Sequence, residues 1–289
     1  MIKLFASDLD GTLLNLFHTL DGTIRASIEE VVRSGAHFAI ATGRTMHSNH
    51  EYGFDGLEVE AVVSNGALIY GRDGAILKYF TMDPAFLEEM LAAFPQVCFE
   101  CVGVDRSYVT GSYEDQMAGF AKDGPLKRIV MRGMRKGREE ALASCLYDQS
   151  TADILSRPIC KVNCRVHDEG LEAELHAFLD EHADTVVNTP FSPTMFEISD
   201  VGTNKGAGVA WLAGYLGFSE DEVAVYGDGG NDVVMLERFE HSYATREACD
   251  EAKAAAAGNI GSCALHAVPH HMVKTVREQA REPRYTQVE

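Results

Sequence analysis

The feature that most constrains the fold is an alternation of short apolar runs with helix-spaced segments at both ends of the chain. Near the N-terminus the apolar residues 2–7 precede a segment with helical spacing at 23–35 and a second apolar run at 37–42. A third apolar run follows at 60–65. Such alternation predicts β-α-β units, in which apolar strands form a parallel sheet that helices cover on both sides. We therefore predict an α/β fold with a doubly wound, Rossmann-like parallel-sheet core.

The middle of the chain breaks this rhythm. A Gly-Arg-Asp-Gly turn between two apolar runs at 67–80 has the signature of a hairpin. In the segment that follows we expect helices at 84–94, 135–148 and 168–182 and strands at 97–104, 107–111, 127–132 and 160–166. Pro190 and Pro193 then mark the return to the first pattern. After the return we expect helices at 204–217, 232–239 and 250–258 and strands at 222–227 and 241–245. The prediction is a core of residues 1–81 and 190–289 with an inserted α+β domain at 82–189.

The composition excludes several kinds of partner. The 289 residues carry a formal net charge of −19 at pH 7 and contain no basic run, which disfavours nucleic-acid binding. An anionic substrate must then be held by local groups. No run approaches the roughly 18 apolar residues of a membrane span, and the N-terminus lacks the form of a signal peptide. We expect a soluble protein of the cytoplasm, with no membrane partner.

The seven cysteines favour reduced thiols, because an odd number does not suit a secreted disulfide framework. Cys98 with Cys101, and Cys160 with Cys164, have spacings that a four-thiolate zinc site could use. Both pairs lie in strand-like runs, where a separation of three residues places Cys98 and Cys101 on opposite faces. Burial as small apolar residues explains the four cysteines better.

Four polar clusters lie where predicted core strands end or the next helix begins. They are Asp8 and Asp10; Thr42, Gly43 and Arg44; Asn204 and Lys205; and the GDGGND stretch at 227–232. Alternate residues of a strand share a face, so Asp8 and Asp10 point the same way, and their repulsion raises one pKa or requires a cation. Because ligands of an open parallel sheet bind beyond the carboxyl ends of its strands, we expect the clusters to converge there.

The residue types in these clusters suit a phosphate and a divalent metal. Mg²⁺ prefers hard oxygen ligands, for which Asp8, Asp228 and Asp232 are the candidates. Thr42 and the backbone amides after it can hold phosphate oxygens, while Lys205 adds positive charge at a helix start. One aspartate of the N-terminal pair can then attack phosphorus, and the other can protonate the leaving group and activate water.

At these positions the sequence resembles the haloacid dehalogenase superfamily. The stretches DLDGTLL at 8–14, ATGR at 41–44, GTNKGAG at 202–208 and GDGGND at 227–232 match its four motifs in order, and SNGA at 64–67 is typical of its Cof-type phosphatases. The resemblance covers both ends of the chain. It implies that the inserted domain is a large α/β cap, which closes over the site and selects the substrate.

The resemblance also implies a role for each matching residue. Asp8 would be the nucleophile that becomes an aspartyl-phosphate, and Asp10 the general acid and base. The residues expected to bind the phosphoryl group or the substrate are Thr42, Gly43, Arg44, Asn65, Lys205 and Asn231. Those expected to bind Mg²⁺ are Asp8, Asp228, Asp232 and, through its backbone carbonyl, Asp10. The implied reaction is Mg²⁺-dependent hydrolysis of a small phosphomonoester, such as a sugar phosphate or similar metabolite.

The C-terminal loops depart from the Cof-type pattern. The departures lie around Thr245 and His266, so substrate contacts known for the family are not carried over to these loops. His270 and His271 either face the site or belong to a solvated helix start after Pro269, and we favour the helix start.

Other residues near the motifs have two interpretations each. Arg44 either contacts the substrate or pairs with a carboxylate, and Asn65 either lines the site or only caps a turn. His47 and His50 are expected at the surface, because they lie in a polar segment. Trp211 is expected to pack in the core on the flank of a helix.

Two further functions remain open. The same phosphoenzyme could pass its phosphoryl group to a sugar, which would make the chain a phosphosugar mutase. Alternatively, the chain could be a non-catalytic phosphate-binding or receiver-like protein, although the inserted domain argues against this. The polar residues of the inserted domain that could select the substrate are Glu100, Arg106, Tyr108, Tyr113, Lys127, Arg128 and Lys161. The oligomeric state is left open.

Overall fold

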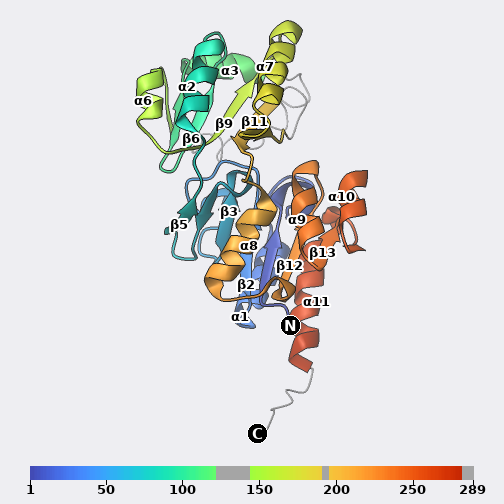
Figure 1. The fold of residues 1–289 in the computed structure, drawn as a ribbon. Helices are drawn as coiled ribbons and strands as arrows, with labels where there is room; N and C mark the ends of the chain where they lie inside the picture. Colours follow the sequence, from blue (N-terminus) through green and yellow to red (C-terminus); the bar gives the residue numbers. More distant parts are fainter. Residues whose placement is uncertain (122–143, 191–194, 282–289) are drawn as a thin grey trace.

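The computed structural model describes residues 1–121, 144–190 and 195–281, whose strands form two separate sheets (Figure 1). The first sheet has the strand order β14-β13-β12-β1-β2-β3-β4-β5, and the second has the order β10-β11-β9-β6-β7-β8. The strands of the first sheet are β1 (Leu4–Ser7), β2 (His37–Ala41), β3 (Glu60–Val63), β4 (Leu68–Tyr70), β5 (Ile76–Tyr79), β12 (Val223–Gly227), β13 (His241–Ala244) and β14 (Gly258–Asn259). Those of the second are β6 (Glu100–Gly103), β7 (Ser107–Val109), β8 (Cys145–Leu146), β9 (Ile159–Arg165), β10 (Val186–Asn188) and β11 (Met195–Asp200). None of the helices in the described residues has the length and apolar character needed to cross a membrane.

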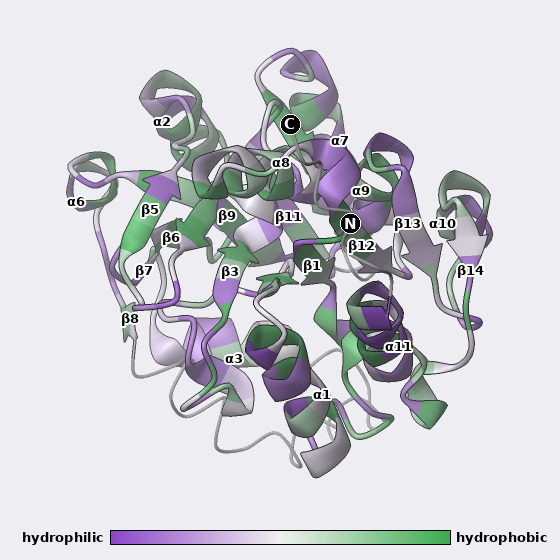
Figure 2. Ribbon diagram, turned by 90° about the horizontal axis from the view of Figure 1, so that it is seen from below, coloured by the Kyte–Doolittle hydropathy of each residue, from purple (hydrophilic) through white to green (hydrophobic). Residues whose placement is uncertain are grey.

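Helices cover both faces of the first sheet, with α1 and α11 on one side and α8 and α9 on the other (Figure 2). The helices of this part are α1 (Gly22–Arg33), α8 (Lys205–Leu216), α9 (Val233–Arg238), α10 (Asp250–Ala255) and α11 (Ala267–Arg281). Phe5 of β1 packs in one hydrophobic cluster with α1 and α11, whereas Leu4 and Ala6 pack in another with α8, α9 and α10. Since β1 also pairs in parallel with β2 and β12, the predicted doubly wound α/β core is confirmed.

The two edges of the first sheet differ from its parallel centre. At one edge β4 pairs antiparallel with β3 and β5, and the Gly71 amide donates to the Ala75 carbonyl (2.8 Å), so the predicted hairpin is present. At the other edge the sequence predicts a helix as far as Gly258. The helix instead ends at Ala255, and Gly258 begins the short strand β14, which pairs with β13.

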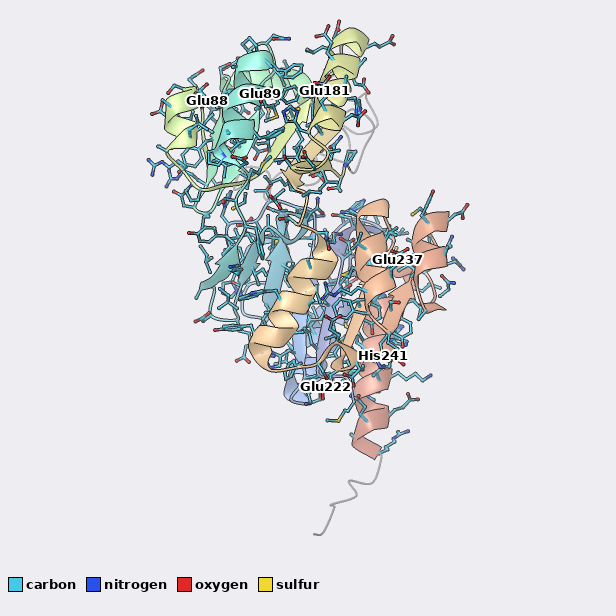
Figure 3. All side chains as sticks on the ribbon, in the orientation of Figure 1. Glu88, Glu89, Glu181, Glu222, Glu237 and His241 are labelled. Atoms are coloured by element: carbon cyan, nitrogen blue, oxygen red, sulfur yellow. The ribbon has the colours of Figure 1, made fainter. Side chains whose placement is uncertain are left out.

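Helices back the second sheet on the face that points away from the first (Figure 1). The helices of this part are α2 (Pro84–Ala93), α3 (Tyr113–Ala121), α6 (Thr151–Leu155) and α7 (Glu169–Glu181). Phe86 of α2 and Leu175 of α7 share a hydrophobic cluster with Ile198 of β11. Glu88 of α2 and Glu181 of α7 project from the outer side of these helices (Figure 3). Part of the acidic excess therefore lies far from the space between the two sheets.

Two of the cysteines considered for zinc binding lie in this hydrophobic cluster. Cys101 and Cys164 are buried there among apolar side chains. Burial raises the pKa of both thiols, whereas a metal ligand must be a thiolate. Their surroundings support the interpretation of these cysteines as small apolar residues.

The chain passes between the two sheets after β5 and after β11. The Met82 amide donates to the Ile159 carbonyl of the second sheet (2.8 Å), directly after the first crossing. The second crossing differs from the prediction, since β11 pairs with β9 and β10 in the second sheet. Phe196 and Ile198 alternate into the hydrophobic cluster of that sheet and hold the strand there. Residues 195–200 thus belong to the inserted domain, and the boundary predicted at 190 is wrong.

Two predicted segments of the inserted domain extend beyond the described residues. The strand expected at 127–132 lies outside them, as does the helix expected at 135–148 up to residue 143. The end of that helix is wrong, because Cys145 and Leu146 form β8 and pair in parallel with β7. Pairing with a distant strand decides the conformation here, and local helical spacing does not show it.

Candidate active site

A tight turn after β1 brings two aspartates to the carboxyl edge of the first sheet. The Asp8 amide donates to the Tyr226 carbonyl of β12 (3.0 Å), which continues the pairing to the end of the strand. The chain turns at Gly11, where φ is +80° and an added Cβ atom would lie 2.2 Å from Asp228 Oδ2. Glycine tolerates both this backbone conformation and the close approach. The turn therefore places Asp8 and Asp228, from two neighbouring strands, in one site.

Lys205 joins two carboxylates in this site. It is the first residue of α8, and the Asn204 side chain caps the helix by accepting a hydrogen bond from the Ala207 amide (2.8 Å). Its Nζ donates to Oδ1 of Asp8 and to Oδ1 of Asp232, each at 2.7 Å, and its side chain is 1 % exposed. Burial opposes its charge, but the carboxylates of Asp232 and Asp8 outweigh this and raise the pKa of Lys205. Lys205 is therefore a fixed cation beside Asp8.

The carboxylates carry more negative charge than Lys205 offsets. Burial, reinforced by Asp232 and Asp228, raises the pKa of Asp8 even though Lys205 lowers it. Burial and Asp232 also raise the pKa of Asp228 to about 6, against the effect of the hydrogen bond from Thr12 Oγ1 (2.7 Å). One carboxylate oxygen from each of Asp8, Asp228 and Asp232 lies within 4.8 Å of the others. Such hard oxygen ligands fit Mg²⁺, and a cation would relieve their repulsion.

The Asp10 side chain has different partners from those of Asp8. The guanidinium of Arg44 donates to both of its oxygens, from Nε (2.7 Å) and Nη2 (2.5 Å), and His18 Nδ1 lies 2.7 Å from Oδ1. Burial opposes ionisation, but the hydrogen bond of His18 and the charge of Arg44 lower the pKa of Asp10. Of the two roles considered for Arg44, contact with the substrate or pairing with a carboxylate, the structure thus has the pairing with a carboxylate. The Asp10 carboxylate lies outside the carboxylate cluster, consistent with a metal-binding role only through its backbone.

His18 is a functional candidate that the sequence patterns do not indicate. It lies on the loop after the turn, in a left-handed backbone conformation with φ +54°. Asn15 shapes this loop, because its Oδ1 accepts hydrogen bonds from the Phe17 and Thr19 amides (2.9 and 3.2 Å). The one signal in the sequence that could have identified His18 is its place in the first loop after the paired aspartates Asp8 and Asp10.

The loop at 42–44 meets two asparagines. Thr42 is buried, and its Oγ1 accepts a hydrogen bond from the Arg44 amide (3.1 Å). Asn231 Nδ2 donates to Asn65 Oδ1 (3.1 Å), and an added Cβ atom at Gly43 would lie 2.8 Å from that same oxygen. The five residues that the sequence assigns to phosphate or substrate binding at these positions are thus brought together. Asn65 is part of this group and not only a turn residue.

Side chains of the second sheet reach the same loop. Lys161 Nζ donates to Glu197 Oε1 (2.8 Å) and, across the space between the sheets, to the Gly43 carbonyl (2.9 Å). Asn65 Nδ2 donates to Thr189 Oγ1 (3.1 Å) and lies 3.5 Å from Glu197 Oε2. The sequence identifies Lys161 among the polar candidates but misses Glu197. The one signal of Glu197 in the sequence is a carboxylate between the alternating apolar residues Phe196 and Ile198 of β11.

Two other candidates of the inserted domain lie on opposite faces of its sheet. Glu100 lies on the core-facing side, because Asn163 next to it donates to Glu100 Oε2 (3.3 Å) and to Thr45 Oγ1 of the core (3.4 Å). Tyr108 packs in the hydrophobic cluster on the other face, and its hydroxyl donates to Asp105 Oδ1 (2.9 Å). Tyr108 therefore does not face the core.

Two of the remaining candidates, Arg106 and Tyr113, do not enter the site. Arg106 pairs with Asp105 at 3.4 Å, and both side chains are about half exposed. Tyr113 is exposed and packs edge-on against Tyr147, with 5.7 Å between the ring centroids. Lys127 and Arg128 lie outside the described residues.

Two residues of the altered C-terminal loops support the site from outside. Thr245 is buried, and its Oγ1 donates to the Gly11 carbonyl (3.1 Å) in the turn after β1. His266 Nε2 lies 2.7 Å from Asp21 Oδ2, at the start of α1. Neither side chain belongs to the carboxylate group.

The histidines near Pro269 belong to a helix, as favoured, but the helix begins earlier. It starts at Ala267, and His270 is exposed on it. His271 is half-buried, and its Nδ1 lies 2.9 Å from the Tyr226 hydroxyl. The expectation of a solvated position is therefore wrong for His271.

Two further histidines, His47 and His50, and Trp211 are partly buried. Both ring nitrogens of His47 and the Nδ1 of His50 are buried, so the surface position predicted for these histidines is wrong. Burial lowers the pKa of His47. Trp211 packs partly against the core cluster and stacks on the exposed Tyr215, with 5.4 Å between the ring centroids.

This arrangement is that of an α/β enzyme core with an acidic site at the carboxyl edge of its sheet and a second domain inserted above it. The profile of the haloacid dehalogenase-like hydrolases matches residues 5–272, and the chain belongs to this family. The predicted resemblance to this superfamily and its Cof-type subgroup, and the predicted class of hydrolase, are confirmed.

Individual relatives match most of the chain. The HMP-PP phosphatase of Citrobacter koseri is 27 % identical over 283 residues, which cover 94 % of this chain and 95 % of that protein. The 5-amino-6-(5-phospho-D-ribitylamino)uracil phosphatase YbjI of Escherichia coli is 25 % identical over 284 residues (96 % and 98 %). The chloroplastic endoribonuclease YBEY of Arabidopsis thaliana is 27 % identical over 260 residues, and the match spans 86 % of this chain but only 42 % of that protein. A haloacid dehalogenase-like hydrolase structure from B. subtilis superposes with a TM-score of 0.79 at 22 % identity (94 % and 99 %), which shows a shared fold.

Proposed function

We propose that the chain is a Mg²⁺-dependent phosphatase that hydrolyses a small phosphomonoester through an aspartyl-phosphate on Asp8. The observation that carries the proposal is the group of carboxylates of Asp8, Asp228 and Asp232, with Lys205 fixed between two of them. A carboxylate that attacks a phosphate dianion needs preorganised positive charge around it. Lys205 supplies one such charge, and the carboxylate group suits a cation that supplies the rest.

On this proposal the reaction has two steps. A carboxylate oxygen of Asp8 attacks phosphorus, and the bond from phosphorus to the leaving oxygen breaks as the leaving oxygen takes a proton from Asp10. Water then attacks the phosphorus of the aspartyl-phosphate and gives a proton to Asp10, while the bond to Asp8 breaks and phosphate departs. Bound Mg²⁺ supplies charge compensation for the transferring phosphoryl group. Thr42 and the Gly43 amide hold the oxygens of the phosphoryl group.

Asp10 must be neutral to act as the acid in the first step. In the described arrangement Arg44 and His18 hold it ionised. We infer that substrate entry loosens at least one of these two contacts, because an ionised carboxylate cannot protonate the leaving group. The second step needs Asp10 as a base, which is the state that Arg44 and His18 favour.

The substrate class and the location are also proposals. Two relatives carry the names of phosphatases, one of them for a phospho-ribitylamino-uracil, which supports a small phosphorylated metabolite as the substrate of this chain. The odd number of cysteines, seven, supports a reducing compartment, and we place the protein in the cytoplasm. The net charge of −19 supports a function without nucleic-acid or membrane partners.

Phosphate release from a panel of small phosphomonoesters tests the proposal. We expect release that requires Mg²⁺, disappears in EDTA, and falls by at least about 10³-fold in Asp8→Asn. Asp10→Asn should also lose turnover, whereas Asp55→Asn, which changes an exposed aspartate, should not. Full turnover by Asp8→Asn would exclude the covalent intermediate. An isomerised sugar phosphate would identify a mutase, and a phosphoenzyme that accumulates without turnover would identify a receiver-like protein.

A further inference from the structure

Lys161 is a buried cation of the second sheet that bonds to the core. Its side chain is 0 % exposed, and its Nζ donates both to Glu197 Oε1 on the neighbouring strand and to the Gly43 carbonyl. Burial of an ammonium is unfavourable unless its hydrogen bonds and charge are satisfied. An apolar side chain of similar size would stabilise the inserted domain without this cost. The contact with Gly43 therefore calls for a role outside that domain.

The Gly43 carbonyl belongs to a peptide unit that links two predicted site residues. The N–H of the same unit is that of Arg44, and it donates to Thr42 Oγ1 (3.1 Å). A peptide unit is planar, so a hydrogen bond that fixes its carbonyl also fixes the direction of its N–H. The hydrogen bond from Lys161 thus orients the Arg44 N–H, and through it the Thr42 hydroxyl. It also orients the backbone of Arg44, from which the side chain extends to Asp10.

Glu197, the partner of Lys161, approaches the site at a second point. Its Oε2 lies 3.5 Å from Asn65 Nδ2, and Asn65 Oδ1 accepts a hydrogen bond from Asn231 Nδ2 (3.1 Å). The buried pair of Lys161 and Glu197 therefore contacts the loop at 42–44 itself, through Gly43, and Asn65 beside that loop. Two side chains of the second sheet, Lys161 and Glu197, thus connect that sheet to the predicted phosphate-binding residues.

We propose that Lys161 is a positioning residue for the phosphate-binding loop at 42–44. On this proposal the inserted domain takes part in setting the catalytic geometry, in addition to any contact that it makes with the substrate. The inference rests on the proposed function for the role of the loop, but the contact of Lys161 with Gly43 does not depend on it.

The test separates positioning from a merely structural role. Lys161→Met alone would leave the Glu197 carboxylate buried without its cation, so the informative variant is the double change Lys161→Met with Glu197→Gln, which removes both charges and keeps the side-chain shapes. Lys161→Gln is a second variant, because its shorter amide can donate to Glu197 but does not extend as far as Gly43. Lys274→Met, at a lysine that is 71 % exposed on α11, is the matched control.

Two measurements are made on the full-length variants. In hydrogen exchange, the Arg44 amide is expected to exchange at least about tenfold faster in the double variant and in Lys161→Gln than in wild type. In steady-state kinetics with Mg²⁺, kcat is expected to fall about 10- to 100-fold with a smaller change in KM, because displacement of reacting groups by about 1 Å has effects of this size. Lys274→Met should match the wild type in both.

The outcomes are distinct. A folded double variant with wild-type exchange at Arg44 and wild-type kcat would overturn the proposal and leave the pair of Lys161 and Glu197 a structural role only. If the double variant does not fold, Lys161→Gln decides by the same two measurements. If the wild type hydrolyses no phosphomonoester, the proposed function fails, whereas the exchange rate at Arg44 still decides whether Lys161 positions the loop.

Discussion

Asp228→Asn is expected to stabilise the protein without metal and to abolish its response to Mg²⁺. Burial and the nearby Asp232 raise the pKa of Asp228 from 3.8 to about 6, although a hydrogen bond from Thr12 opposes the rise. The folded state therefore binds the proton of this carboxyl more tightly than the unfolded state does. By linkage, its contribution to stability is fully present below about pH 4 and is lost as the pH rises to about 6. Above that range the fold carries a disfavoured charge, which asparagine removes.

The size of the effect follows from the same pKa. The difference between 3.8 and about 6 corresponds to about 3 kcal/mol, at 1.36 kcal/mol for each pKa unit. Asparagine keeps an acceptor for the hydrogen bond from Thr12 Oγ1 (2.7 Å), and the stabilisation that this bond gives to the charged carboxylate is already contained in the pKa of about 6. The free energy of unfolding of Asp228→Asn should therefore exceed that of wild type by about 3 kcal/mol at about pH 8, and by less than about 1 kcal/mol at about pH 4.

Urea unfolding at about pH 4, 6 and 8 in EDTA, and at about pH 8 with MgCl₂, measures these free energies. Mg²⁺ should stabilise the wild type, because a ligand that binds the folded state raises the free energy of unfolding. It should have little effect on Asp228→Asn, which lacks one of three carboxylates of the group. Asp55→Asn is the matched control at an exposed position. A variant that is less stable than wild type in EDTA at about pH 8, or that Mg²⁺ stabilises equally, would refute the reasoning.

Two further predictions concern the loop arginine and two glycines. Arg44→Met removes a charge that lowers the pKa of Asp10, so the basic limb of the profile of kcat/KM against pH, along which Asp10 loses the proton that the first step requires, should move to higher pH, and an unmoved limb would contradict the pairing. Gly66→Ala should lower the free energy of unfolding by at least about 2 kcal/mol, because φ is +99° and the new Cβ would lie 2.3 Å from the Asn204 carbonyl oxygen. Gly214→Ala in α8, where no atom lies within 4 Å, should raise it by about 0.5–1 kcal/mol. Thermal unfolding compares the two alanine variants, and a similar loss of stability in both would show that the close approach at Gly66 is unimportant.

Local patterns were sufficient for the elements that carry the site. The strand before Asp8 and the helix that begins at Lys205 were predicted within a residue or two, because apolar periodicity and helix capping act over a few neighbouring residues. The boundary near Pro190 was not predicted correctly. Prolines end an element locally, but the sheet that the next strand, 195–200, joins depends on which apolar cluster receives Phe196 and Ile198.

Patterns in the sequence are enough to predict the α/β core, the inserted domain and the acidic and basic residues at the ends of the core strands. Which of these charges meet depends on the folded arrangement of the two sheets. Lys205 bonds to Asp8 across 197 positions of the chain, Arg44 binds Asp10 across 34, and Lys161 reaches Gly43 across 118. No local periodicity carries this information, because the partners are set by how the strands align in the sheets and how the two sheets face each other. The pKa values of Asp8, Asp10 and Asp228 follow from those partners and from burial, so they too are properties of the folded chain.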